Sequence, residues 1–238
     1  MSPPAHSSWN GLLFVNKPSG PTTYDMIRWL KKKVPGIKIG HSGTLDPLAS
    51  GLVILLLGNA TKRQSELMKQ NKTYRCTMRL GIQTDTGDQT GITIHQSTVP
   101  DLNKDEIISV FQQFLGEQWQ TPPMYSALKH KGQPLYKLAR KGEQVERTAR
   151  SIQIHQIDLL ENKLKEEIEF RTSVSSGTYV RVLVEDMGKK MGTHATLSAL
   201  CREAIGENKL EKALDGNDLN TLTPDQILHH LIEIPIHA

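Results

Sequence analysis

The sequence predicts a mixed α/β (α+β) fold in which a central, largely antiparallel sheet is flanked by helices. Three observations carry this prediction: strand and helix patterns interleave, several strand patterns are hairpin-like neighbours, and no internal repeat or long low-complexity linker interrupts them. With 238 residues, 37% of them hydrophobic and 23% charged, the chain is long enough for a sizeable core. We therefore expect one continuous domain over residues 11–238, preceded by a frayed tail over residues 1–10.

The chain begins with a strand, a turn and a helix. Leu12–Val15 is a short apolar run that predicts a strand, and the Pro- and Gly-containing segment after it predicts a turn. Thr22 or Thr23 is suited to cap the helix that follows. The apolar face of this helix would comprise Ile27, Leu30 and Val34.

Two strands with different burial come next. Leu52–Leu57 is uniformly apolar, which is typical of a buried strand. Residues 72–80 alternate instead between apolar and polar side chains, which predicts a strand with one buried face. The apolar side of that alternation comprises Tyr74, Cys76, Met78 and Leu80.

Capping and turn signals order the rest of the chain. Asn103 and Glu106 form a capping box for a helix that Gly116 would end, and Pro122-Pro123 favours a loop over Trp119–Ser126. The remaining expected elements are a short basic helix over 134–142, strands over 151–160 and 168–174, a helix from 177 to about 192, a strand over 195–205, and a helix capped by Thr223 and Gln226.

Positive charge is concentrated in one segment. Lys129–Arg150 contains seven basic and two acidic residues, a net charge of +5, so the rest of the chain carries about −1 of the total +4. Such a segment on a near-neutral body suggests a polyanionic partner. A solvated, charged helix face is the structural alternative.

Several classes of protein are disfavoured. No apolar run approaches the roughly 20 residues of a membrane helix, and the N-terminus lacks the pattern of a secretory signal. The cysteines, Cys76 and Cys201, form no paired motif, which fits a reducing compartment and a cytoplasmic location. The nine histidines are scattered, and the adjacent His229 and His230 would point in different directions on a helix, so we expect no metal site.

A single carboxylate, Asp46, stands in a turn-rich segment directly before the predicted buried strand. Because Asp-Pro suits a helix start, Asp46 could cap one helical turn that Gly51 ends. The same rigid turn would also preorganise a nucleophile or base. Since glycosidase-type hydrolysis normally uses two acids and no second acid is close in this stretch, an ordinary hydrolase is not favoured.

The segment Gly40–Pro47, together with Ala49 and Gly51, resembles the signature of the TruB family of tRNA pseudouridine synthases. Four further blocks agree in order, and the resemblance spans about residues 11–206. These blocks are Asn16-Lys17-Pro18 before the signature; Lys72-Thr73-Tyr74 with Gly81, Thr84-Asp85-Thr86 and Asp88; Pro123–Lys129 with Gly132, Tyr136 and Ala139-Arg140; and, as the last block, Gly177–Arg181 with Leu197–Arg202.

The resemblance implies a fold, a reaction and a partner. It implies the pseudouridine synthase fold with an RNA-binding insertion at about residues 120–150, and isomerisation of uridine to pseudouridine at position 55 in the T-loop of tRNA. This chemistry needs no redox step, metal or cofactor. The expected partner is the T-arm of tRNA, without a membrane or guide RNA, and the expected state is a monomer.

The resemblance also implies roles for individual residues. Asp46 matches the catalytic aspartate, Tyr74 the aromatic on which the flipped uracil stacks, and Arg181 the arginine that pairs with the aspartate. His41 matches a histidine that contacts RNA near the flipped base, and Leu200 an apolar pocket wall. Matching positions and the basic segment add the substrate-contacting residues Lys17, Pro18, Tyr179, Lys129, Lys131, Arg140, Lys141 and Arg202.

Two departures from the family pattern qualify these expectations. Cys201 stands where the family often has the first of two arginines. The 38 residues after Leu200 are too few for the rest of the sheet and a C-terminal RNA-binding (PUA-like) domain, so we expect that domain to be absent. Two alternatives to T-loop modification are an RNA-binding or tRNA-folding module in which catalysis is secondary, and a pseudouridine synthase for another structured RNA.

Overall fold

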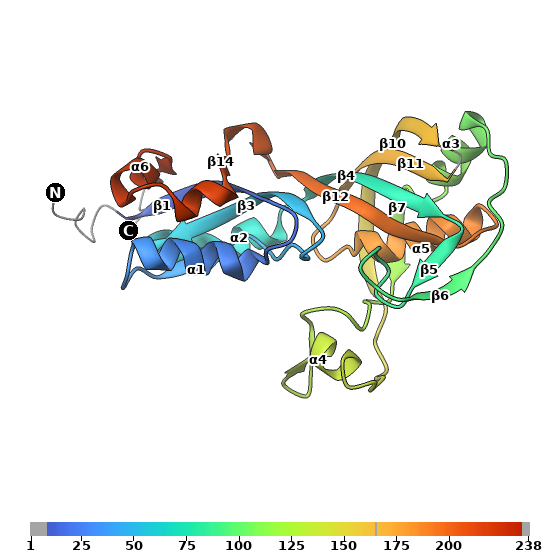
Figure 1. Cartoon of the computed structure of the whole chain (residues 1–238), viewed down its shortest axis with the longest axis horizontal. Coiled ribbons are helices and arrows are strands. Elements are labelled where there is room, and N and C mark those ends of the chain that lie inside the picture. Colours follow the sequence, from blue (N-terminus) through green and yellow to red (C-terminus); the bar gives the residue numbers. More distant parts are fainter. Residues whose placement is uncertain (1–8, 165, 235–238) are drawn as a thin grey trace. The chain divides into compact units, whose positions relative to one another are not determined.

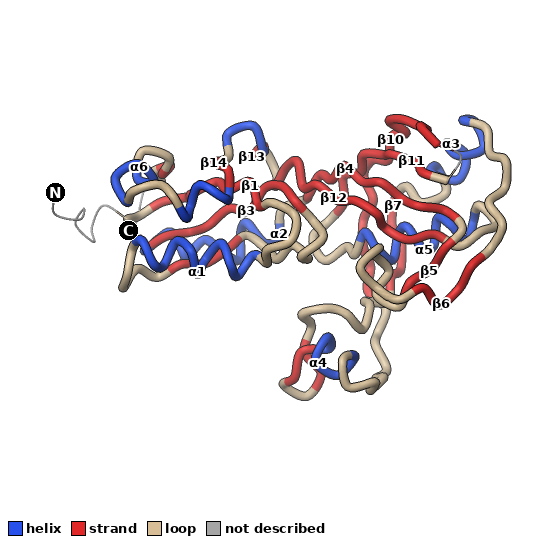
Figure 2. The backbone as a smooth tube through the Cα atoms, viewed as in Figure 1, coloured by secondary structure: helices blue, strands red, loops and turns tan. Residues whose placement is uncertain are grey.

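The structure is a computed structural model that describes residues 9–164 and 166–234 (Figure 1). Its internal contacts divide the chain into two compact units. Unit 1 comprises the chain up to Tyr74 and from Leu200 onward, and unit 2 comprises Arg75–Ala199. The chain passes between the units in β4 (Lys72–Leu80) and β12 (Ala195–Ile205). Strands and helices interleave as predicted, so the mixed α/β class is confirmed (Figure 2).

Unit 1 is built on a pair of long antiparallel strands, β1 (Gly11–Lys17) and β3 (Ser50–Leu57). The end of β12 runs parallel to β3, and the C-terminal strands β14 (Leu214–Asp215) and β15 (Leu231–Ile232) pair with β1. Every residue of β3 after the first is buried, which confirms the predicted buried strand.

Helices and short strands complete unit 1. The helix α1 (Thr23–Lys33) is capped by Thr22, whose side chain forms a capping box with Asp25. The remaining elements are β2 (Ile39–His41), η2 (Gly58–Arg63), α2 (Gln64–Lys69), β13 (Asn208–Lys209), η3 (Leu210–Lys212), η4 (Gly216–Asn220) and α6 (Pro224–Leu228). Residues 1–8 of the expected tail lie outside the described residues, whereas Trp9 is buried and Asn10 accepts a hydrogen bond from the backbone of Asn59, so both belong to the folded unit.

Unit 2 contains a second run of strands in the order β12, β4, β11 (Glu167–Val174), β10 (Arg150–Leu164), β7 (Gly116–Gln120). The predicted alternation in β4 is confirmed, because every second residue from Lys72 to Leu80 is buried. The predicted helices at 104–115 and 177–192 are α3 (Lys104–Gln112) and α5 (Val180–Lys190). A separate hairpin of β5 (Ile82–Thr84) and β6 (Thr93–Gln96) completes the unit.

The insertion leaves unit 2 between β7 and β10. Gln120 pairs with Arg150 at its base, and within it a hairpin of β8 (Lys129–His130) and β9 (Gln133–Pro134) leads into α4 (Leu135–Ala139). Figure 1 shows the part with α4 projecting from the rest of the unit. The loop predicted from Trp119 is wrong at its start, because Trp119 pairs with Ser151 in β7 and cross-strand hydrogen bonding overrides the following prolines.

The described residues contain neither a membrane-spanning helix nor a cluster of metal ligands. Within 9–164 and 166–234, no helix is long and apolar enough to cross a membrane. The same residues hold no group of three or more His, Cys, Asp or Glu side chains placed to bind a metal ion.

Candidate active site

Asp46 lies in a tight turn between β2 and β3 of unit 1. The backbone N–H of Ala49 donates to the carbonyl of Asp46 at 3.1 Å, which closes a β-turn, and no helix follows. The structural alternative, in which Asp46 caps one helical turn, is therefore wrong. The Asp46 side chain is half-buried, so it is held by the protein and still reachable.

Contacts from four elements fix this turn. Ser42, fully buried, exchanges hydrogen bonds with the backbone of Ile54 on β3, each 3.0 Å long. Leu45 donates its N–H to the hydroxyl of Thr23, in the first turn of α1, at 2.9 Å. The loop after β1 supplies the third contact, from Gly20 N–H to the Pro47 carbonyl at 2.8 Å. The carboxylate is thus preorganised by backbone contacts on both sides of it.

Arg202, on β12, supplies the fourth contact and connects the turn to Tyr74. Its side chain is 1% exposed; Nε donates to the Leu52 carbonyl at 2.7 Å and a terminal nitrogen donates to the Gly43 carbonyl at 3.0 Å. Burial lowers the pKa of its guanidinium, and a hydrogen bond with the Tyr74 side chain opposes that shift. The family resemblance predicts that Arg202 contacts RNA, but this geometry suits a positioning role inside the protein.

Lys17, at the end of β1, is another buried cation beside the turn. Its ammonium donates to the carbonyls of Pro18 and Pro21 at 2.8 and 2.7 Å and lies 3.4 Å from that of Pro47. Burial lowers the Lys17 pKa to about 8, the Asp46 carboxylate opposes this shift, and Arg202 adds to it. The Lys17 side chain is fully buried. Like Arg202, it holds the turn from inside the protein, in place of the RNA contact that the resemblance implies.

Of the other predicted residues of unit 1, Tyr74 and His41 interact with Arg202, and Leu200 contacts the start of β3. Tyr74 is 9% exposed and bonded to Arg202. His41 accepts a hydrogen bond from Gly43 N–H at Nδ1, and its pKa is lowered by burial and then by Arg202. Leu200 is half-buried, and its carbonyl accepts a hydrogen bond from Ser50 at 3.4 Å. Tyr74 thus contacts the buried Arg202 guanidinium. His41 contacts the turn that this guanidinium holds, and Asp46 is part of that turn.

Arg181 belongs to unit 2, at the start of α5. Its side chain is buried and donates to the carbonyls of Thr86 at 2.5 Å and Tyr125 at 2.7 Å. Its Nε lies 3.9 Å from a carboxylate oxygen of Asp88. Because a cation at a helix N-terminus is disfavoured by the helix dipole, the buried Asp88 carboxylate offsets an otherwise unfavourable placement.

Asp88 is a functional candidate whose role becomes visible only in the fold. One carboxylate oxygen accepts hydrogen bonds from the Thr86 hydroxyl and from both the N–H and the hydroxyl of Thr90. Such a satisfied network keeps the other oxygen directed toward Arg181. The Thr-Asp-Thr-Gly-Asp segment indicates a functional acid at this place in the sequence. Only the fold, however, shows that Asp88 is buried beside Arg181.

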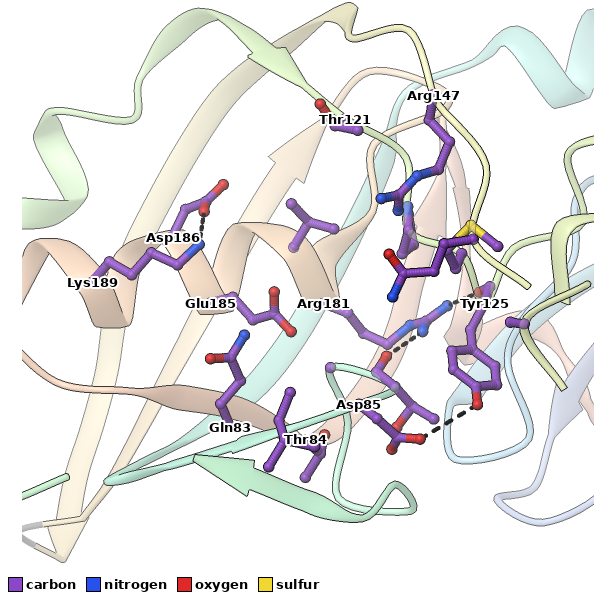
Figure 3. Close-up of a pocket in the computed structure, with 18 of the residues that line it drawn as sticks. Gln83, Thr84, Asp85, Thr121, Tyr125, Arg147, Arg181, Glu185, Asp186 and Lys189 are labelled. Carbon is purple, nitrogen blue, oxygen red and sulfur yellow. Dashed lines mark hydrogen bonds and ion pairs between the residues drawn. The ribbon is translucent and has the colours of Figure 1, made fainter. Parts of the chain in front are cut away.

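A cavity of about 570 Å³ in unit 2 has Arg181 in its wall. Figure 3 shows Arg181 between Glu185 and Tyr125, with the Tyr125 hydroxyl directed at Asp85, 3.4 Å away. Burial raises the pKa of Glu185. The cavity is bounded by α5, the 84–87 turn and the base of the insertion, so α5 and the insertion share a surface within unit 2.

The predicted basic residues of the insertion are available to a ligand. The side chains of Lys129, Lys131, Arg140 and Lys141 are all exposed, and two buried leucines, Leu135 and Leu138, hold α4 in place beneath them. Pro18 and Tyr179 are half-buried, and Tyr179 exchanges two backbone hydrogen bonds with the Gln120 side chain.

Comparison with known proteins identifies the family of this chain. The model of "TruB family pseudouridylate synthase (N terminal domain)" matches residues 28–180. The chain is 41% identical to a tRNA pseudouridine synthase B of Opitutus terrae over 94% of this chain and 93% of the relative. It is 44% identical to the protein of that name from Fusobacterium nucleatum, over 84% of this chain and 69% of the relative.

A solved structure is similar as well. A chain of a Cbf5-Nop10-Gar1 complex superposes with a TM-score of 0.71 and 29% identity, covering 92% of this chain. This chain spans 56% of that chain's length. The matched residues include the Asp88 turn and the start of α5, so the family model covers segments of both units. The protein is therefore a member of the TruB family of pseudouridylate synthases.

Proposed function

We propose that this protein isomerises uridine to pseudouridine in the T-loop of tRNA, at position 55. The family is that of pseudouridylate synthases, and relatives called tRNA pseudouridine synthase B are about 40% identical over most of this chain. The observation that carries the proposal is the turn of Asp46, which backbone contacts from both sides hold in one conformation. A preorganised carboxylate is what a reaction without metal or cofactor requires.

The reaction is an internal exchange of bonds at one nucleotide. The bond between ribose C1′ and uracil N1 breaks, the base turns over, and C1′ bonds to C5. The C5 proton is then lost and N1 gains a proton, so no electrons are transferred to or from a partner. The target base must first leave the stack of the folded tRNA, at a cost of a few kcal/mol.

Asp46 is the reacting carboxylate in this proposal, and its neighbours position it. Arg202 and Lys17 hold the carbonyls of Gly43 and Pro47 on either side of it. Tyr74 offers its ring to the flipped uracil, while the bond to Arg202 fixes the orientation of its hydroxyl. The family resemblance pairs Arg181 with Asp46; these residues belong to different units, and the pairing stays a prediction.

The test replaces Asp46 with asparagine, which preserves size and removes the charge. We expect pseudouridine formation in tRNA to fall by at least a thousandfold, on the order of the loss that removal of a reacting group causes. Binding of tRNA should change little, because the variant loses little surface. The measurements are single-turnover pseudouridine formation and equilibrium tRNA binding.

A matched control is Asp105→Asn, which removes an exposed carboxylate of α3 in unit 2. Turnover near the parent rate by Asp46→Asn would contradict the assignment. Site-by-site mapping of pseudouridine in cellular RNA, with and without the protein, decides between the T-loop and another structured RNA. A cytoplasmic location, a monomeric state and the lack of a guide RNA remain predictions that accompany this function.

A further inference from the structure

A second concentration of positive charge lies in unit 1, beside the turn of Asp46. The fifteen residues Tyr24–Lys38 contain five basic residues and one acidic residue, a net charge of +4. The insertion needs twenty-two residues, Lys129–Arg150, to reach +5. The net charge outside Lys129–Arg150 is close to zero only because residues 203–234, with seven acidic and two basic residues, carry −5.

The geometry of α1 collects this charge on one stripe. With about 100° of rotation per residue, Tyr24, Arg28, Lys31 and Lys32 fall within roughly 100° of the helix circumference. The buried residues of α1, among them Met26 and Leu30, lie on the opposite side. The stripe therefore faces away from the core of unit 1.

The side chains of the stripe are available to a partner. Tyr24 is 60% exposed, and Arg28, Lys31, Lys32 and the following Lys38 are exposed as well. Arg28 lies over the Tyr24 ring at 5.7 Å and pairs with Asp25. For Lys31, Lys32 and Lys38, the described part of the chain shows no acidic partner.

The helix dipole accounts for only part of this arrangement. Lysines in the last turn, Lys31–Lys33, complement the partial negative charge at the C-terminal end of α1. That effect fades within one turn, so it does not explain Arg28, which lies nearer the middle of the helix, or Lys38, which lies beyond its end.

The stripe begins next to the catalytic turn. Thr23, in the first turn of α1, accepts the hydrogen bond from Leu45, the residue before Asp46. From there α1 extends for eleven residues, about 16 Å at 1.5 Å per residue. Since a helical nucleic acid strand carries a phosphate about every 3.4 Å, this length corresponds to four or five phosphates.

We propose that the basic face of α1, formed by Arg28, Lys31 and Lys32, together with Lys38 in the segment after the helix, binds the phosphate backbone of the RNA that carries the target uridine. This inference rests on the proposed function, which places a tRNA nucleotide at Asp46. The face is a second electrostatic contact, carried by the unit that holds Asp46, whereas the basic insertion belongs to unit 2. It binds a few nucleotides away from the target and carries no sequence preference of its own.

The experiment removes the three lysines that lack an acidic partner. The variant Lys31→Gln, Lys32→Gln, Lys38→Gln should bind unmodified tRNA at least about tenfold more weakly at low salt, and the slope of log affinity against log salt should fall by roughly two to three. Pseudouridine formation at saturating tRNA should stay near the parent rate, because Asp46 and its turn are untouched.

The matched control carries Lys190→Gln, Lys209→Gln and Lys212→Gln, which removes the same charge from exposed lysines elsewhere. A third variant, Lys31→Arg, Lys32→Arg, Lys38→Arg, should bind like the parent, so a loss caused by unfolding of α1 is distinguished from a loss of charge. If the glutamine variant and the control give parallel salt plots with equal affinities, the proposal is wrong. Failure of the parent to modify tRNA would instead overturn the proposed function, since the binding comparison does not need turnover.

Discussion

The turn of Asp46 and the insertion of unit 2 use polar residues in opposite ways. In the turn, residues 42–49, the backbone is bonded to residues of β1, β3, β12 and α1, and the cations among them, Lys17 and Arg202, are buried. In the insertion, main-chain hydrogen bonds form a short hairpin, a short helix, the base at Gln120 and Arg150 and a few turns, and most cationic side chains are exposed.

This difference separates two requirements of an RNA-modifying enzyme. A reacting carboxylate must stay within a fraction of an ångström of its productive position, which requires neighbours with fixed hydrogen bonds. Phosphate binding needs only charge at the right distance, and exposed flexible lysines supply it. Substitutions in the turn should therefore affect stability and turnover together, whereas substitutions in the insertion should affect affinity alone.

The largest expected effect is at Gly51, where β3 meets β12. Gly51 has φ +103°, and a Cβ there would lie 2.4 Å from the Arg202 carbonyl oxygen. The contact is with the backbone of Arg202 on the paired strand, which cannot move aside as a side chain can. Gly51→Ala should therefore lower the free energy of unfolding by more than about 3 kcal/mol. Chemical denaturation measures the change, and pseudouridine formation should fall with it.

Gly20 provides the control for backbone conformation. It has φ +105°, and a Cβ there would meet nothing within 4 Å. Gly20→Ala should cost only the strain of a positive φ, about 1–2 kcal/mol. Equal losses in the two variants would show that the close approach of β3 and Arg202 is not what holds the turn.

The next effect concerns the insertion. Replacing Lys129, Lys131, Arg140 and Lys141 with alanine should weaken tRNA binding by at least about tenfold and reduce the salt slope by roughly three to four. Unfolding and turnover at saturating tRNA should barely change, because all four side chains are exposed. The readouts are tRNA affinity over a salt series, thermal unfolding and single-turnover rate.

The comparison variant removes four exposed lysines elsewhere, Lys104, Lys190, Lys209 and Lys212. Similar affinities and parallel salt plots for the two variants would mean that the insertion is a solvated face. A large drop in turnover at saturating tRNA would instead show that the insertion also positions reacting groups.

The smallest effect is a pH dependence that originates at Lys17. Its folded-state pKa of about 8 is below the ordinary value of 10.5, so between these values the unfolded chain binds more protons than the folded chain. The contribution of Lys17 to stability therefore rises as pH increases from about 8 toward 10.5, and below pH 8 the buried charge is a cost. Lys17→Met should flatten the stability–pH curve in this window.

Lys31→Met serves as the control, because it removes one lysine that is exposed on α1. The measurement is the free energy of unfolding at several pH values on both sides of pH 8. An unchanged slope in Lys17→Met would mean that Lys17 keeps its proton throughout the window and contributes to the turn as a charged group only.

Local sequence patterns predicted the structure correctly wherever the conformation of a residue depends on its near neighbours in the chain. The uniform apolar run predicted the buried strand β3, alternation predicted β4, and capping residues placed the starts of α3 and α6. The limits of the insertion followed from its charge and the family resemblance, and Gln120 and Arg150 pair at its base. The family blocks also point to Asp46, Tyr74 and Arg181 from the sequence alone.

Sequence patterns alone predict the strands, the helix caps, the charge of the insertion and the family, whereas the roles of the cations beside Asp46 depend on tertiary contacts. Asp46-Pro47 suits a helix start by local rules, yet contacts from β1, α1, β3 and β12 hold it in a turn. The family resemblance predicts that Arg202 contacts RNA, but its guanidinium donates a hydrogen bond to the carbonyl of Leu52, 150 residues earlier in the chain. Burial of a charge depends on partners that only folding brings together, and a local pattern does not specify them.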